Sequence, residues 1–315
     1  MEGDADAFWA LLVTFLLNAG LALLVGSSAS LVWLRHSRSE WSGRLRARSS
    51  TCVGVGVAIS LLAGVFDLWL RSANAAEVSL HHAWPAVSSM LVASHYGRAW
   101  IIGTVALATV AGTCLLRLTR KSQPQSVLLA TLILPVAVFV YTRSVVSHAS
   151  AEGDWSIGVA VDWLHLTLIA LWTGMVFVAS LVGLGCSLQT VEDKTDLAAW
   201  IHALSSTATL ALVGILVTGA LNTWRGTAGS PSSLLGARYG AVLFIKLFFV
   251  SVAIGLGAHN RFRLLPALTA ELQTSSPETP SLSIFVKIIR VEAFVLAAAL
   301  AAAAVLSSTE SPALS

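Results

Sequence analysis

Long uninterrupted apolar runs are the feature that most constrains what this sequence can fold into. Eight of them approach or exceed the roughly 20 helical residues that cross a hydrocarbon layer about 30 Å thick. In lipid the backbone must satisfy its own hydrogen bonds, and a helix does so within one segment. We therefore predict an all-α fold, a polytopic membrane helix bundle of about eight transmembrane helices, at residues 8–34, 51–70, 97–118, 127–141, 159–184, 204–221, 241–258 and 284–306.

Composition supports the same class of protein. Hydrophobic residues make up 56% of the 315 residues and charged residues only 11%, with a mean hydropathy of +0.79. A soluble domain carries roughly 25% charged residues. A soluble globular protein is therefore excluded, and the lipid bilayer is the expected surrounding.

The fourth and the first apolar runs each lead to a further expectation. The fourth, 127–141, is short and contains Pro135, so we expect its helix to be longer than the run or bent. The chain starts with the acidic stretch Met-Glu-Gly-Asp-Ala-Asp, which is unlike the basic start of a cleaved signal peptide. We therefore expect the first helix to remain in the mature protein.

The basic residues predict the orientation. Of the 19 Lys and Arg residues, thirteen fall on one side of the predicted spans. By the positive-inside rule that side is cytoplasmic, so both termini are expected to be periplasmic. The formal net charge of +3 then follows from topology, and we expect no nucleic-acid partner. The thirteen are Arg35, Arg38, Arg44, Arg46, Arg48, Arg117, Arg120, Lys121, Lys194, Arg261, Arg263, Lys287 and Arg290.

Similar stretches in the two halves predict an internal repeat. Ser94-His95-Tyr96-Gly97-Arg98 leads into the third span and Ala237-Arg238-Tyr239-Gly240-Ala241 into the seventh. We predict a four-plus-four parallel repeat, with an N-terminal half at 1–150 and a C-terminal half at 151–315. Both outer loops are expected to carry a short surface helix, and the longer loop of the first half, 71–96, has apolar residues at near-helical spacing. Alternatively, these Trp, Tyr and Arg residues only mark the membrane interface.

Histidines gather on the predicted outer side. His81, His82, His95 and His148 fall at the outer surface, and His165 falls about one turn inside the fifth span. Neutral imidazole suits copper, zinc and haem iron. These five residues are our predicted metal ligands.

The fifth span carries the richest set of polar and soft side chains. At about 100° per residue, His165 and Trp172 lie within roughly 20° of each other, and Met175 lies about 80° away. Met175 is a candidate softer ligand that favours Cu(I), and Asp162 is a candidate acceptor for the second N–H of His165. The alternative for this face is a polar helix end with a packed Met and Trp.

Other polar residues lie in or beside the predicted spans. Lys246 is near the start of the seventh, where it must reach outward or pair with Asp67, Asp162 or Glu292. At the inner face, His259 with Cys114 and Cys186 is a candidate exit site for a soft ion, although free Cys is ordinarily a small buried hydrophobe. With Cys52, all three cysteines fall near the cytoplasmic leaflet, which argues against a disulfide framework.

An ordered set of polar landmarks resembles the copper-resistance D (CopD) family of inner-membrane proteins. The similarity is strongest from 158 to 308 and extends more loosely to the whole chain. It also includes the fifth-span residues His165, Leu171, Trp172 and Gly174. The landmarks are Leu221-Asn222-Thr223-Trp224-Arg225, Leu234-Leu235-Gly236-Ala237-Arg238-Tyr239-Gly240, Lys246, His259-Asn260-Arg261 and Arg290-Val291-Glu292.

The resemblance implies copper uptake across the bacterial inner membrane, often beside a small periplasmic copper-binding (CopC-like) partner. The chain departs from a methionine-rich copper pattern because it has only three Met, which leaves coordination to the histidines. Two rival hypotheses stay open: a membrane electron carrier with b-type haem held by His95, His148 or His165, and a copper-sensing or scaffold protein. No GxxxxGK[ST], GxSxG or HExxH motif is present, so we expect no enzyme.

Overall fold

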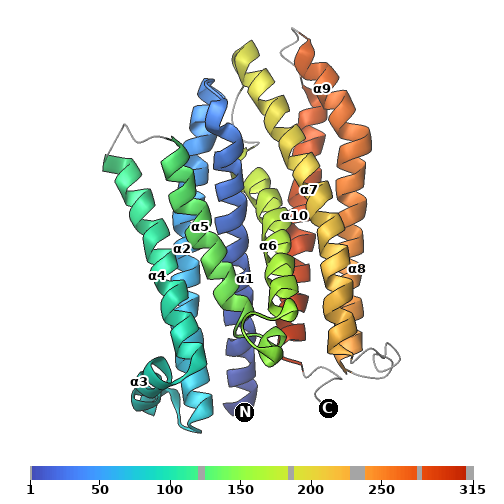
Figure 1. Ribbon diagram of the computed structural model, residues 1–315. Helices are drawn as coiled ribbons and strands as arrows, with labels where there is room; N and C mark the ends of the chain where they lie inside the picture. Colours follow the sequence, from blue (N-terminus) through green and yellow to red (C-terminus); the bar gives the residue numbers. More distant parts are fainter. Residues whose placement is uncertain (1, 120–124, 184–187, 228–237, 275–278, 310–315) are drawn as a thin grey trace.

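The structure is a computed structural model that describes residues 2–119, 125–183, 188–227, 238–274 and 279–309. Within these ranges it is all-helical and has no strand. Eight long helices run between the two ends of an elongated bundle (Figure 1). They are α1 (Glu2–Trp33), α2 (Glu40–Ala75), α4 (His95–Thr119), α5 (Gln125–Ser144), α6 (Ile157–Val178), α7 (Val191–Gly226), α8 (Arg238–His259) and α10 (Pro280–Ser307).

The predicted spans all coincide with long helices, and seven helical segments of the described residues are long and apolar enough to cross a membrane. This confirms the all-helical class of membrane protein. The eighth predicted span falls on α5, which is longer than the apolar run, as expected, and contains Pro135 within it. Its described apolar part, Ala130–Ser144, is shorter than the other seven, so the count of eight stays a prediction.

Short helices complete the bundle at its two ends. Both termini lie at one end, here called the terminal end, and the other is called the opposite end (Figure 1). The surface helix predicted in the outer loop is present at the terminal end as α3 (Trp84–Ala93), after a 3₁₀ turn, η2 (Leu80–His82). The second half's counterpart falls on 228–237, outside the described residues. The four-plus-four repeat and the periplasmic termini therefore remain predictions.

Two of the helices continue through π-helical segments. The segment η4 (Ala179–Gly183) follows α6, and η6 (Asn260–Leu264) joins α8 to α9 (Leu265–Gln273). Two 3₁₀ turns besides η2 lie next to long helices: η1 (Leu34–His36) follows α1, and η3 (His148–Glu152) precedes α6. Single π turns inside helices occur frequently at functional sites. Both π segments pack against α10, which lies between their helices.

The backbones of α1 and α6 lie very close together. A Cβ atom on Gly26 would overlap the carbonyl of Gly174, and one on Gly174 would overlap the carbonyl oxygen of Ala22. Only glycine allows two backbones to meet this closely, as is common between helices in membranes. Because α1 also packs against α2 and α10, it connects the predicted halves along their length.

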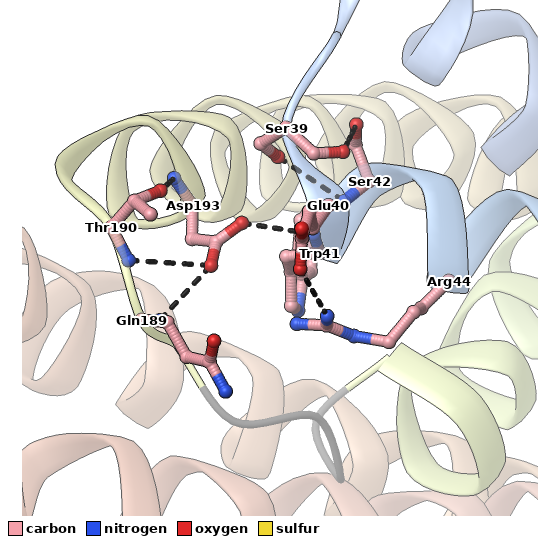
Figure 2. Close-up of polar contacts among 8 residues, drawn as sticks. All are labelled: Ser39, Glu40, Trp41, Ser42, Arg44, Gln189, Thr190 and Asp193. Atoms are coloured by element: carbon pink, nitrogen blue, oxygen red, sulfur yellow. Dashed lines mark hydrogen bonds and ion pairs between the residues drawn. The ribbon is translucent and has the colours of Figure 1, made fainter.

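At the opposite end, Asp193 holds two helix starts together (Figure 2). Its carboxylate accepts hydrogen bonds from the backbone N–H groups of Trp41 at 2.8 Å, Gln189 at 3.0 Å and Thr190 at 3.4 Å. Thr190 caps α7 by accepting from the N–H of Asp193, which completes a capping box. Ser39 caps α2 in the same region. One carboxylate thus fixes the turn between α1 and α2 onto the start of α7.

Replacing this carboxylate should weaken the whole bundle. We expect Asp193→Asn to lower the free energy of unfolding by about 1–3 kcal/mol, because buried backbone donors lose a charged acceptor. Thermal unfolding in detergent, followed by tryptophan fluorescence, measures the change. Glu192→Gln, an exposed residue in the same turn, is the control and should unfold like the wild type. Equal melting of the two variants would contradict a structural role for Asp193.

Candidate functional site

A cavity of about 550 Å³ opens at the terminal end of the bundle. The surrounding side chains come from α2, α3, α4, the turn after α5 and η3, so segments far apart in sequence meet there. Two of them, Met90 and His95, are soft or borderline metal ligands. The lining residues are Arg71, Asn74, Ala75, Met90, His95, Tyr96, Val145, Val146 and Ser150.

A buried carboxylate fixes one wall of this cavity. Asp67 is 5% exposed. Its carboxylate accepts a hydrogen bond from the Tyr96 hydroxyl at 2.6 Å and forms an ion pair with Arg71 at 3.0 Å. The Arg71 guanidinium also lies over the Tyr96 ring, 5.1 Å from its centroid. A Cβ on Gly97 would overlap the carbonyl of Met90, so α3 packs tightly on α4. Together these contacts hold Met90 and His95 in place at the cavity.

His95 is the one predicted outer ligand that lines the cavity. Its Nε2 lies 2.9 Å from a carboxylate oxygen of Asp154. A carboxylate can only accept, so Nε2–H donates, and the lone pair of the neutral ring is on Nδ1. A carboxylate that accepts one ring N–H is the usual support for a histidine that binds metal through the other nitrogen.

The other predicted outer ligands are not gathered around His95. His81 and His82 lie on η2, and His148 begins η3; all three are exposed. His82 Nδ1 lies 2.9 Å from the Ser79 hydroxyl. Among the described residues, no group of three or more His, Cys, Asp or Glu side chains is close enough to hold a metal ion. The outer histidines of the described residues are therefore exposed at this end of the bundle but form no closed metal centre.

Inside the bundle, His165 is held by one hydrogen bond to the neighbouring helix. Its Nδ1 lies 2.8 Å from the hydroxyl oxygen of Thr218 on α7, and that hydroxyl donates its single proton to the Gly214 carbonyl at 2.6 Å. The hydroxyl must therefore accept from Nδ1–H, which leaves the lone pair of His165 on Nε2. Gly219 makes room for the ring, because a Cβ there would lie 3.1 Å from Cε1.

The structure gives Thr218 the role that the sequence suggested for Asp162. Asp162 instead accepts a hydrogen bond from the Ser147 hydroxyl at 3.2 Å. Lys246, half-buried on α8, interacts electrostatically with both Asp162 and His165. Of the three carboxylates proposed as its partner, Asp162 is thus the one whose charge acts on Lys246.

Further toward the opposite end, α6 meets a second buried polar group. Glu292 on α10 is 3% exposed, and its carboxyl group interacts with the side chains of Trp172 and Asn260, the latter at 3.5 Å. Met175 is 1% exposed and packs in the larger apolar cluster of the bundle, together with Trp172. Trp172 therefore contacts both Glu292 and the apolar cluster that contains Met175. Met175 itself is packed among apolar side chains, as the alternative interpretation of a packed Met and Trp expects.

The remaining predicted polar residues lie near the ends of the helices. Arg225 forms an ion pair with Glu152 at 3.4 Å and covers Gly158 at the start of α6. Asn222 is half-buried near the end of α7, and His259 is exposed at the end of α8. Cys52 and Cys114 are not joined in a disulfide, and Cys186 lies outside the described residues.

Comparison with known proteins identifies the class. The chain belongs to the copper resistance protein D family of membrane proteins: residues 198–306 match the family described as Copper resistance protein D, and residues 5–159 match Copper resistance protein D-like, N-terminal domain. It is similar to the Copper resistance protein D of Pseudomonas syringae pv. tomato, with 23% identity over 260 residues that cover 81% of this chain and 82% of that protein. No solved structure matches. The resemblance stated from the sequence is confirmed, and the family points to a role in copper resistance.

The role of the hydrogen bond from His165 to Thr218 can be tested by mutation. On the sequence-based prediction that His165 binds copper, we expect Thr218→Val to weaken that binding by roughly 10- to 100-fold, because the imidazole loses the acceptor that fixes its orientation. Competition with a coloured Cu(I) chelator, on purified protein in detergent, measures the affinity. Thr223→Val is the matched control, since Thr223 donates to the Gly219 carbonyl one turn further along the same helix. An equal loss in both variants would contradict a specific role for Thr218.

Proposed function

We propose that this protein moves copper from the periplasm across the bacterial inner membrane and so contributes to copper homeostasis or resistance. The observation that carries the proposal is His165, an imidazole inside a membrane-spanning helix whose Nδ1–H is given to Thr218 and whose Nε2 keeps its lone pair. Ionisable residues at such positions are costly and usually functional. Membership of the copper resistance protein D family indicates that the metal is copper.

Copper would enter at the terminal end, which the distribution of basic residues predicts to be the periplasmic side. His81, His82 and His148 are exposed there, and His95 and Met90 line the cavity. The Nδ1 lone pair of His95 and the thioether of Met90 are suited to a soft ion. In this proposal the exposed histidines capture copper, in some cases from a CopC-like chaperone, and the cavity receives it.

The step inside the membrane would use His165, followed by the region of Met175, Trp172 and Glu292 toward the opposite end. The described residues hold no three-ligand cluster of His, Cys, Asp or Glu. That arrangement suits a protein that passes copper between weak sites better than one that stores it, because a closed, fully ligated site releases its ion slowly. His95 and His165 would be two such sites along one path.

Copper accumulation in cells tests the proposal. We expect His165→Ala to reduce accumulation of mass-labelled copper at least about tenfold relative to the wild type at equal expression, because the path loses its intramembrane ligand. His202→Ala is the control: His202 is also a histidine, but it is exposed near the opposite end and belongs to no proposed copper site. Unchanged accumulation in the His165 variant would remove His165 from the path.

Measurements on purified protein distinguish copper transport from the two rival functions. A b-type haem carrier would be red with a Soret band, whereas a copper transporter would be nearly colourless. A scaffold would bring down a periplasmic copper protein yet give no copper flux in reconstituted vesicles. Either result would refute transport as the function.

A further inference from the structure

A second cavity, of about 480 Å³, lies at the opposite end of the bundle. It is formed where α7 passes the continuous helix made by η6 and α9. Its polar lining consists of basic and uncharged side chains with no Asp or Glu among them. The lining includes His202, Ser206, Arg261, Phe262, Thr269 and Gln273.

Arg261 is already held in position at this cavity. Its Nη1 donates to the carbonyl oxygen of Ser205 at 3.0 Å and to the Ser205 hydroxyl at 2.9 Å. Both bonds use the same nitrogen, so the Nη2 and Nε donors of this half-buried guanidinium are the ones we assign to a ligand. The planar donors of Arg fit the oxygens of a phosphate group. His202 and Thr269 line the same cavity, with 3.4 Å between Nε2 and Oγ1.

The cavity leads onto an apolar surface. Only 22% of the apolar window of α7 and 17% of that of the α8–α9 helix is buried, against 33% or more in the other five candidate spans. Val213 is eleven positions after His202, so at 100° per residue it falls within about 20° of the same face of α7. Val213 and Val217 are 58% and 57% exposed, and Phe262 beside the cavity is 72% exposed. A headgroup site thus lies directly above a face suited to acyl chains.

We propose that this cavity binds the phosphate headgroup of an anionic phospholipid, whose acyl chains lie along the exposed face of α7. The position agrees with this ligand, because basic pockets between helices at the cytoplasmic surface receive anionic headgroups. The contact uses residues separate from His95 and His165, so the proposal stands independently of copper transport.

Native mass spectrometry of the full-length protein, released from membranes that contain phosphatidylglycerol, tests the site. We expect Arg261→Gln to retain about tenfold less phosphatidylglycerol than the wild type, because one charge-assisted contact is lost. Arg263→Gln is the matched control, since Arg263 is exposed in the same π segment and is not among the residues that line the cavity. Equal retention in the two variants would overturn the proposal.

A second measurement does not depend on the variant folding. Added phosphatidylglycerol should raise the melting temperature of the delipidated wild-type protein, whereas phosphatidylcholine and inorganic phosphate should have little effect. If phosphatidylcholine stabilises equally, the face binds lipid without recognising charge and the proposal fails. If inorganic phosphate raises the melting temperature as much as phosphatidylglycerol does, the cavity binds a free anion rather than a lipid headgroup, and the proposal fails. A dimer formed through this face that added lipid cannot dissociate would also refute it.

Discussion

The direct contact between the backbones of α1 and α6 is the constraint on which the rest of the bundle depends. Lipid offers no hydrophobic drive for helices to associate, so close van der Waals packing must supply it, and Gly26 and Gly174 make such packing possible. Since α6 is held against α1 on one side and packs against α7 on another, His165 lies among neighbouring helices. The pairing with Thr218 is a result of that placement.

The sequence predicted the helices well because apolar runs, charge bias and turn residues are local signals. It also found His165, whose polarity within an apolar run is visible without any structure. It did not pair Thr218 with His165, and it missed Met90 and the group formed by Asp67 with Tyr96, because these contacts depend on how each helix is rotated about its axis. Only the Ser94–Arg98 repeat pointed toward Tyr96. For the same reason it could not foresee that His81, His82 and His148 stay apart from the cavity that His95 lines.

His95 and His165 share one chemical arrangement despite very different surroundings. Each gives one ring N–H to an oxygen of a neighbouring segment, Asp154 in one case and Thr218 in the other, and keeps the opposite nitrogen unprotonated when neutral. The outer residue has a charged acceptor near water, and the inner one has a neutral acceptor among apolar helices. A charged acceptor polarises the N–H that it accepts more strongly than a neutral hydroxyl does. In the proposed path, the two histidines are therefore expected to differ in how tightly they hold copper.

The Asp193 carboxylate also limits how the length of this chain can change. It binds the N–H of Trp41 in one connection and those of Gln189 and Thr190 in another, so the two turns must keep their lengths together. An insertion in either would pull its donors away from the shared acceptor. We expect relatives of this protein to accept added or deleted residues far more readily around α3, at the other end of the molecule, than in either of these connections.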